Sequence, residues 1–326
     1  MLARTNMGFT ALSCPQCGGS LPGQARWRLV VCPYCRSSVT RNAELVQAAA
    51  FRDALLRRRS QAQGVAPAVA LGDRRFRVLG RLGGGESADV YLADELGCAA
   101  QLVAVKVARE ATGSTLKSEW HVLQSLQAIE TAGSAYFSQR LPQPVSIGSM
   151  VDQDGSRRQA LVVRCAHGSW GSLADVMTLN PAGVDARHAV WMWRRVLQLL
   201  AFVHGNGWAH GALSPDHLLV EPREHGIQII GWSRAARSTP DSLALDLAHS
   251  AWSIRAVLTG GDPTSGIGAQ VPAQIGALLR RVSEDTRWCR SQDASTLDAA
   301  LLQAAQAAFG PPRFMNFDPA PDQRRH

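Results

Sequence analysis

Residues 82–91 read Leu-Gly-Gly-Gly-Glu-Ser-Ala-Asp-Val-Tyr, and residues 103–106 read Val-Ala-Val-Lys. The glycine-rich stretch separates two runs of strand-forming residues, so residues 76–107 predict three short strands with a turn at the glycines. Glycines at such a turn allow backbone N–H groups to approach phosphate oxygens closely. The third of these strands would contain Lys106.

Lysine is rare in this chain, since Lys106 and Lys117 are the only lysines among 34 basic residues. A lysine in the third strand is therefore hard to explain by composition alone. Glu119 lies near the start of residues 118–129, which predict a helix. A glycine loop, a strand-three lysine and a helix glutamate in this order resemble the protein kinase family.

The resemblance continues in chain order to about residue 310. The matching segments are the strand-five and hinge region (160–169, with Val163 as gatekeeper and 164–166 as hinge), the helix leading into the catalytic loop (202–219), the start of the activation segment (229–233) and the central helix of the larger lobe (246–260). The resemblance implies a bilobal protein-kinase-like fold.

The pattern of elements also predicts the α+β class, because a β-rich half precedes an α-rich half. Strand-like runs occupy residues 143–165, and helices are predicted over 172–179, 186–204, 242–259, 271–283 and 294–308. We divide the chain into a zinc ribbon (1–42), a helix and linker (43–75), a kinase-like N-lobe with hinge (76–166), a kinase-like C-lobe (167–310) and a tail (311–326). Within the second segment, residues 43–59 predict the helix and residues 60–71 the linker.

The positions that carry the chemistry in the kinase family are substituted here. Active members carry H-R-D-L-K-x-x-N, whereas residues 210–217 read His-Gly-Ala-Leu-Ser-Pro-Asp-His. The resemblance therefore implies Ala212 at the catalytic base, Ser214 at the catalytic-loop lysine, His217 at the metal-binding asparagine and Gly231 at the metal-binding aspartate. We expect no catalytic role for these four residues.

The magnitudes of the missing contributions favour a loss of activity. A positioned general base contributes about 10²- to 10⁴-fold in rate, and electrostatic stabilisation of the phosphoryl group contributes at least as much. Scaffold positions are retained: the resemblance implies that His210 and Trp232 stack below Leu123, and that Asp246 anchors the catalytic-loop backbone. We therefore predict a pseudokinase with little or no phosphoryl transfer, acting as a protein-binding scaffold or allosteric regulator in bacterial signalling.

Nucleotide binding is a separate question from catalysis. The resemblance implies seven positions that would surround ATP: Gly83, Gly85, Val90, Ala104, Lys106, Glu119 and Leu219. Lys106 could reach the α- and β-phosphates, or it could form a structural ion pair with Glu119. Ala88 replaces the third loop glycine, and Mg²⁺ is not expected because its usual carboxylate is absent.

Asp216 supports an alternative reading, an atypical Ser/Thr protein kinase that uses this carboxylate as a displaced base or metal ligand. The simpler reading is a loop or helix-capping aspartate after Pro215. His217 could likewise ligate a metal ion or make a hydrogen bond within its loop.

Four cysteines near the N-terminus predict a metal site. They form the pairs Cys14-Pro-Gln-Cys17 and Cys32-Pro-Tyr-Cys35, separated by fourteen residues. Two such hooks can place four thiolates tetrahedrally around one Zn²⁺ at about 2.3 Å. The sequence therefore resembles a zinc ribbon over residues 12–40, with Trp27 to Val31 as a strand leading into the second hook. Four thiolates leave no open coordination position, so the zinc would be structural.

Composition limits the remaining classes. With 326 residues, 46% of them hydrophobic, the chain can form a substantial core, and it shows neither a membrane-length apolar run nor a signal-peptide pattern. We expect a cytoplasmic protein. Residues 1–60 hold nine arginines and two acids, and thus +7 of the net charge of +8. This basic region suggests a second alternative, a nucleic-acid-binding regulator using the ribbon and Arg57 to Arg59.

The expected partner is another protein. A zinc ribbon joined to a kinase-like body resembles architectures found in bacterial stress and conflict gene clusters. That resemblance implies an active kinase, a protein phosphatase or a von Willebrand factor A-type protein as partner.

Overall fold

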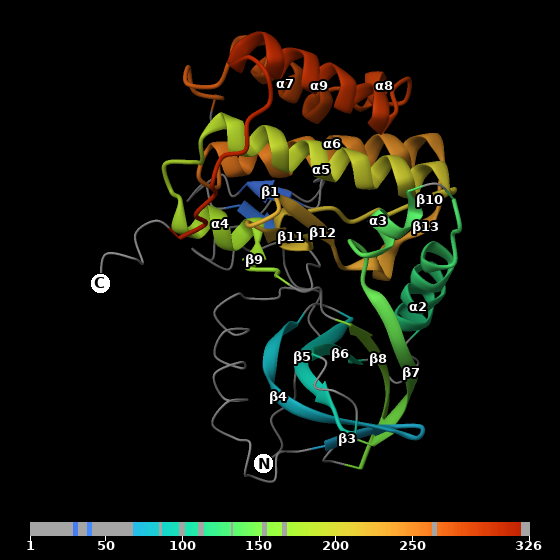
Figure 1. Ribbon diagram of the computed structural model, residues 1–326. Coiled ribbons are helices and arrows are strands. Elements are labelled where there is room, and N and C mark those ends of the chain that lie inside the picture. Colours follow the sequence, from blue (N-terminus) through green and yellow to red (C-terminus); the bar gives the residue numbers. More distant parts are fainter. Residues whose placement is uncertain are drawn as a thin grey trace.

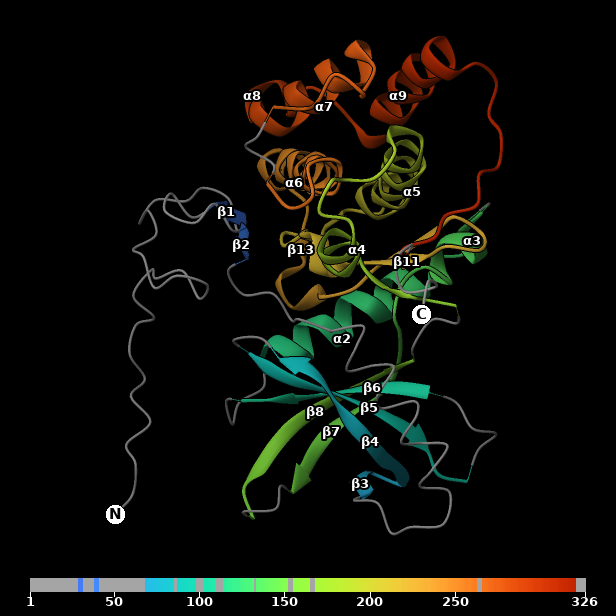
Figure 2. The ribbon, with the colours of Figure 1, turned by 90° about the vertical axis from the view of Figure 1, so that its left-hand side faces the viewer.

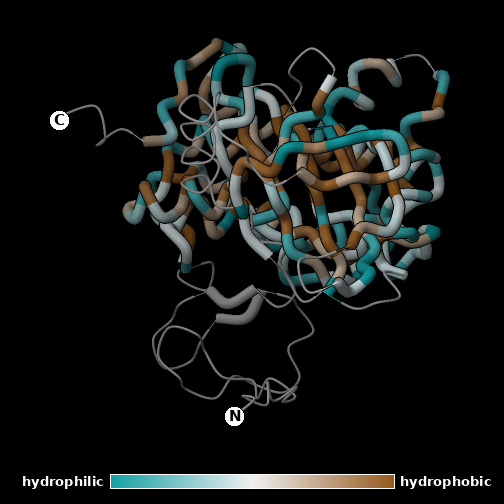
Figure 3. The backbone as a smooth tube through the Cα atoms, turned by 90° about the horizontal axis from the view of Figure 1, so that it is seen from below, coloured by the Kyte–Doolittle hydropathy of each residue, from teal (hydrophilic) through white to brown (hydrophobic). Residues whose placement is uncertain are grey.

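The computed structural model describes residues 29–31, 38–40, 68–84, 87–97, 102–109, 114–131, 133–151, 155–164, 168–262 and 266–320. A β-rich part precedes a larger helical part (Figure 1), which confirms the α+β class. Hydrophobic residues gather in the interior of the described body and hydrophilic ones along its outline (Figure 3). No helix among the described residues is long and apolar enough to cross a membrane.

Six of the described strands form one antiparallel sheet. Their order across the sheet is β3 (Ala68–Leu71), β4 (Arg74–Gly84), β5 (Ala88–Glu95), β6 (Leu102–Ala108), β8 (Arg157–Arg164) and β7 (Gln143–Val151). Val90 of β5 pairs with Lys106 of β6, which in turn pairs with Leu161 of β8. The strands predicted within residues 76–107 and 143–165 are confirmed.

The linker predicted over residues 60–71 is wrong at its C-terminal end. Ala68–Leu71 forms β3, which pairs antiparallel with the start of β4. The strand forms because Leu71 is only 2% exposed and packs with Phe76 against Val105 and Val162 on one face of the sheet. The sheet therefore begins before residue 76, the boundary predicted for the β-rich half.

The helix α2 (Ser114–Gln127) connects the two parts of the molecule. It packs against β7 and β8 and against the short 3-10 helix η2 (Trp232–Arg234) of the helical part. Leu116, Val122, Leu123 and Leu126 form its buried face. The predicted helix over residues 118–129 is confirmed, although the observed helix starts four residues earlier and ends two residues earlier.

The helical part contains α3 (Ser134–Ser138), α4 (Leu173–Leu179), α5 (Ala186–Gly205), α6 (Pro240–Leu258), α7 (Ala273–Glu284), α8 (Thr286–Cys289) and α9 (Ala294–Phe309). Side-chain caps explain several of the boundaries: Ser172 caps α4, Asp185 caps α5 and Thr239 caps α6, which has Pro240 in its first turn. The five helices predicted after residue 171 are confirmed within about two residues at each end.

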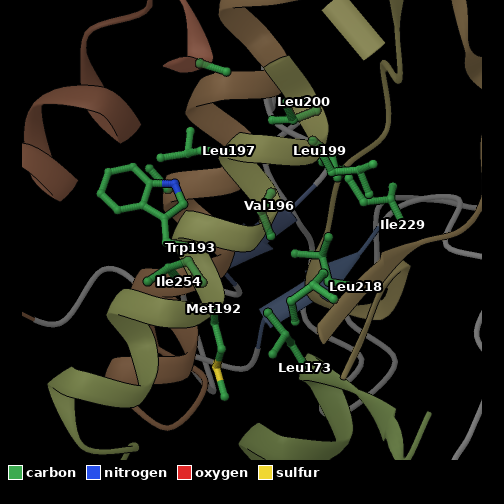
Figure 4. Close-up of a cluster of buried hydrophobic side chains, with 14 of the residues drawn as sticks. Leu173, Met192, Trp193, Val196, Leu197, Leu199, Leu200, Leu218, Ile229 and Ile254 are labelled. Carbon is green, nitrogen blue, oxygen red and sulfur yellow. The ribbon is translucent and has the colours of Figure 1, made fainter. Parts of the chain in front are cut away.

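The core of the helical part lies around α5 and α6. Trp193, Val196, Leu197 and Leu200 of α5 are fully buried among residues of neighbouring elements (Figure 4). The Trp193 indole N–H donates a hydrogen bond to Ser250 Oγ of α6 at 3.0 Å. One continuous buried cluster extends from α2 to α9, so the core also reaches the contact between the two parts.

Short strands and turns complete the helical part. β11 (Leu218–Glu221) pairs with β9 (Gly171–Ser172) and β12 (Gly226–Ile229), and β10 (Trp208–Ala209) pairs with β13 (Ala236–Arg237). The 3-10 helix η1 (Pro215–His217) precedes β11. These elements hold the segments 210–217 and 230–234 next to each other, as shown by the hydrogen bond from Ile230 N–H to His217 O.

The segment called the tail packs on the helical part as far as residue 320. After α9 the chain runs back along α5 (Figure 2), and Phe317 is 5% exposed. The Asn180 side-chain amide donates to Pro319 O at 3.0 Å, and His225 Nε2–H donates to Met315 O at 2.7 Å. Residues 310–320, here named the return segment, are therefore part of the folded body.

Near the N-terminus, the described residues are two paired strands. β1 (Leu29–Val31) and β2 (Ser38–Thr40) are antiparallel, with Val31 opposite Ser38. The strand predicted up to Val31 is confirmed for residues 29–31. Cys14, Cys17, Cys32, Cys35 and the helix predicted over residues 43–59 lie outside the described residues.

Candidate functional site

Lys106 and Glu119 form a buried ion pair between the sheet and α2. Lys106 Nζ lies 2.7 Å from Glu119 Oε1, and the two residues are 5% and 0% exposed. Trp232 N–H points to the same carboxylate oxygen at 3.4 Å. The pair therefore joins β6, α2 and η2, three elements that are far apart in the sequence. Because both charged groups are buried away from water, replacing either residue would leave the other charge unpaired and would lower the free energy of unfolding.

Gly83 and Gly84 are the last two residues of β4, directly before the glycine turn. They pair with Val90 and Asp89 of β5. Asp89 accepts hydrogen bonds from the guanidinium groups of Arg81 and Arg109 at 2.7 and 2.8 Å. The hydrogen bond from Arg109 is the main reason that the pKa of Asp89 lies below its ordinary value. Gly85 lies outside the described residues.

A Cβ atom at Gly84 would lie 2.5 Å from Asp89 Oδ1 and 2.8 Å from Arg81 Nη2, so a side chain there would require the ends of these side chains to shift. Successive residues of a strand face opposite sides of a sheet, so Asp89 lies on the face opposite Val90 and Lys106. The Asp89 cluster therefore packs beside Gly84 on the face away from Lys106. Gly84 and this cluster were not predicted as site residues from the sequence, although an acidic residue between arginines on adjacent strands is a visible signal.

Two of the other predicted nucleotide positions, Val90 and Ala104, share the face of Lys106. Val90 is 1% exposed, and half-buried Ala104 lies opposite Leu92 on the neighbouring strand. Val163, the expected gatekeeper, pairs with Ala104 from β8 and is 5% exposed. Leu219 comes from the helical part, where it lies on β11 between Ser172 and Gln228. Of the expected hinge residues only Arg164 is described, and it donates to Gln143 Oε1 at 2.9 Å.

Asp246 of α6 holds the backbone of the segment 210–211. Its carboxylate accepts hydrogen bonds from His210 N–H at 2.7 Å, Gly211 N–H at 2.8 Å and His204 Nε2 at 3.1 Å. Burial by itself would raise the pKa of this fully buried group, but the hydrogen bond and charge interaction with His204 bring the pKa below its ordinary value. The predicted anchoring role of Asp246 is confirmed.

His210 and Trp232 pack edge to face, with ring centroids 4.7 Å apart. Ala212 N–H donates to His210 Nδ1 at 3.2 Å, so Nε2 carries the proton and donates to Ile230 O at 2.9 Å. Leu123 and Trp232 belong to the same buried cluster. The predicted contact of His210 with Trp232 is confirmed, but the rings meet edge to face rather than stacked, and the two hydrogen bonds of a neutral imidazole fix His210 in place.

The ring of His217 lies against the backbone of Gly231. Gly231 has a φ of 80°, and a Cβ atom there would lie 2.5 Å from both Cδ2 and Nε2 of the imidazole. His217 Nδ1–H donates to Ala212 O at 2.6 Å, which holds the ring in this position. A side chain at position 231 therefore has no space while His217 keeps this conformation.

The other substituted positions of this loop are also buried. Ala212 is 2% exposed, Ser214 is 3% exposed and His217 is 3% exposed. Asp216 lies half-buried in η1. Among the described residues, no group of three His, Cys, Asp or Glu side chains is placed to hold a metal ion.

The candidate site therefore has two sides. The sheet contributes the buried cation Lys106, and the closely packed segments 210–217 and 230–234 form the other side. The sequence predicted the pairing of Lys106 with Glu119, which the structure shows. It did not reveal that His217 and Gly231 are complementary in shape, because their contact depends on the pairing of β11 with β12. Comparison with protein-family models and with curated protein sequences finds no match.

Proposed function

We propose that this chain is a pseudokinase, a protein-kinase-like protein that performs little or no phosphoryl transfer and serves as a scaffold or regulator in the bacterial cytoplasm. The order of the site elements supports the proposal: a glycine turn between β4 and β5, Lys106 on β6, Glu119 on α2, then the segments 210–217 and 231–233. This is the order in which the kinase family carries its signatures.

The packing of His217 against Gly231 is the observation that carries the proposal. In active kinases an aspartate and an asparagine hold Mg²⁺ at these two positions. Here the imidazole occupies the space beside position 231, and no carboxylate is present at either position. The two substitutions thus remove both metal ligands, and the His217 ring fills the space that a carboxylate at position 231 would need.

The position of the catalytic base supports the same conclusion. Ala212 offers only a buried methyl group, and its carbonyl is engaged by His217. Without a base and without metal ligands, losses of about 10²-fold or more accumulate for each missing group. The retained Lys106–Glu119 pair and Asp246 maintain structure, which is sufficient for a protein that acts by binding.

We also propose that ATP binds on the Lys106 side of the site and that it binds without Mg²⁺. Val90, Ala104 and Lys106 lie on one face of the sheet, as adenine and phosphate contacts would require. A ligand that binds the folded state stabilises it by RT ln(1 + [L]/Kd) and thereby raises the melting temperature. We expect ATP to stabilise the protein equally with Mg²⁺ and with EDTA.

Radiolabelled ATP tests the absence of catalysis. The full chain is incubated with γ-³²P-ATP, general protein substrates and either Mg²⁺ or Mn²⁺, beside the Lys106→Met and Asp216→Asn variants. We expect the wild type to incorporate no more label than Lys106→Met. Transfer that disappears in Lys106→Met would overturn the proposal, and transfer that also disappears in Asp216→Asn would establish the atypical kinase instead.

We also propose that the four N-terminal cysteines hold one structural Zn²⁺. The proposal rests on their spacing, and the paired strands β1 and β2 on either side of residues 32–37 are compatible with a ribbon. Elemental analysis of the purified chain should find one zinc per molecule. The Cys14→Ser and Cys17→Ser variants should lose it, whereas Cys289→Ser, which changes a buried cysteine of the helical part, should keep it.

A further inference from the structure

A cavity of about 530 Å³ lies between α5, α9 and the return segment. Its lining comprises residues of α5 (Arg187, Val190, Trp191, Arg194), His225, residues of α9 (Leu302, Ala305, Gln306, Phe309) and residues 310–315. None of them belongs to the candidate site described above. The volume falls within the range of small-molecule sites, about 300 to 1,000 Å³.

Among the described residues, three arginines line this cavity: Arg187, Arg194 and Arg313. Arg194 is neutralised by Asp298 of α9, which accepts from both arms of its guanidinium at 2.7 and 3.1 Å. Arg187 lies above the ring of Phe309, its guanidinium carbon 5.1 Å from the centroid, and its Nη1 is 3.8 Å from Asp185 Oδ2 in an exposed pair. Arg187 and Arg313 are therefore the arginines that offer exposed planar donors to a carboxylate or phosphate.

One wall of the cavity is an aromatic stack. Trp191 and His225 are parallel within 4° at a centroid distance of 4.3 Å, and Phe314 stacks on His225 at 4.3 Å and 16°. Phe314 is nevertheless 67% exposed, an unusual exposure for a phenylalanine held in a stack. Phe314 ends the stack, so its ring offers a flat apolar face to a planar ligand.

The middle ring of the stack belongs to a residue of the turn between β11 and β12, where Glu221 pairs with Gly226. His225 has a φ of 54°, the left-handed region, which this hairpin turn accounts for. Arg195 Nε–H donates to its carbonyl at 3.1 Å, and its own Nε2–H donates to Met315 O at 2.7 Å. These two hydrogen bonds fix the ring between Trp191 and Phe314.

We propose that this cavity is a binding site for a small aromatic anion, a planar body of one or two rings that carries a carboxylate or a phosphate. The rings stack on the exposed ring of Phe314, and the anionic group is held by Arg187 and Arg313. The volume, the exposed guanidinium groups of Arg187 and Arg313 and the exposed ring of Phe314 each favour such a ligand. This inference is independent of the proposed pseudokinase function.

Isothermal titration calorimetry of the full chain tests the proposal with four probes of defined chemistry. They are 2-naphthoate, 1-naphthyl phosphate, the neutral analogue 2-naphthamide and the aliphatic anion decanoate. We expect naphthoate or naphthyl phosphate to bind about tenfold more tightly than naphthamide, as a charged hydrogen bond requires. Binding of decanoate as tight as that of the aromatic anions would overturn the aromatic part of the proposal.

Variants locate the binding in this cavity. Replacing both arginines, Arg187→Gln with Arg313→Gln, should weaken naphthoate binding about tenfold, and Phe314→Ala about fivefold. Arg290→Gln removes an exposed arginine outside the cavity, which pairs with Asp241, and should leave the affinity unchanged. Circular dichroism checks that each variant is folded, and Arg313 and Phe314 are exposed enough to be replaced without unfolding. An absence of binding, equal binding of acid and amide, or insensitivity to these replacements would refute the site.

Discussion

The sheet side and the loop side of the candidate site differ in the charged residues that they carry. On the sheet side, Lys106 and Glu119 keep a buried ion pair at 2.7 Å. On the loop side, positions 212, 214 and 231 carry Ala, Ser and Gly, and the ring of His217 fills the space beside the last of them. The buried carboxylate of Asp246 is directed at backbone N–H groups of this loop, and Asp216 lies half-buried within it.

This difference indicates that buried charge persists where it joins elements of the fold, and under the proposed function it is absent at the positions where active kinases hold Mg²⁺. Buried ionic groups are expensive unless they are fully satisfied, so their retention needs a structural reason. Lys106 and Asp246 both have one, because each connects segments that are distant in the sequence. Three substitutions and one change of pH, from the most to the least disruptive, test this reading.

Replacement of Asp246 should have the largest effect. Asp246→Ala leaves two buried backbone N–H groups and the His204 ring without their acceptor, which should lower the free energy of unfolding by about 5 kcal/mol. Urea denaturation measures the loss. Asp241→Ala is the matched control, since it removes an exposed ion pair from the same helix and should cost about 0.5 kcal/mol or less. Equal losses in the two variants would contradict the anchoring role.

Breaking the Lys106–Glu119 pair should cost slightly less. Lys106→Met removes the positive charge beside the buried Glu119 carboxylate, which should lower the free energy of unfolding by about 4 kcal/mol. The double variant Lys106→Met/Glu119→Leu removes both charges and should recover most of that loss. A single variant as stable as the wild type would show that Lys106 has no structural role.

Gly231 should tolerate a methyl group poorly. Gly231→Ala combines the cost of a positive φ with overlap of the His217 ring, about 3 kcal/mol together. Gly72 is the matched control: its φ is 63°, and a Cβ atom there would meet nothing within 4 Å. Gly72→Ala should therefore cost only about 1 kcal/mol, the backbone contribution. If both glycines respond alike in chemical denaturation, the close packing of His217 is not significant.

The smallest expected effect is a loss of stability around the return segment when the pH is lowered. Burial lowers the pKa of His188 and of His225 below the ordinary value of 6.5. Trp191 Nε1–H donates to His188 Nδ1 at 3.3 Å, which requires that this nitrogen be unprotonated. Stability contributed by the neutral rings is therefore complete above pH 6.5 and decreases as the pH falls from that value through the lower folded-state pKa.

Hydrogen exchange of residues 310–320 at pH 7.5 and pH 5.5 measures this decrease. Exchange should accelerate at pH 5.5 relative to the intrinsic rate, and a His188→Gln/His225→Gln variant should lose most of the difference. An equal protection at both pH values would mean that the two histidines do not hold the return segment.

Several features could be read directly from residue patterns. The strands around residues 82–107 follow from alternating β-formers and glycines, and the helices from apolar periodicity with capping residues such as Asp185 and Thr239. The roles of Asp246 and His210 followed from the motif around them and are confirmed. β3 was missed because Ala-Val-Ala-Leu is short and of small residues, and its strand state depends on pairing with β4.

Other features depend on contacts between distant segments. The complementarity of His217 and Gly231 requires two strands to pair, and the Asp89 cluster requires three strands in register. The cavity is formed by α5, α9 and the return segment, which is more than one hundred residues from α5 along the chain.

The sequence by itself determined the α+β class, the order of strands and helices, and the absence of acidic side chains at the loop positions, because these depend on residue type and local spacing. Only the tertiary structure decided which of those residues touch: that an imidazole fills the space at Gly231, and that arginines and aromatic rings from three segments surround one cavity. Such contacts depend on how close-packed elements meet in space, which local propensity does not encode.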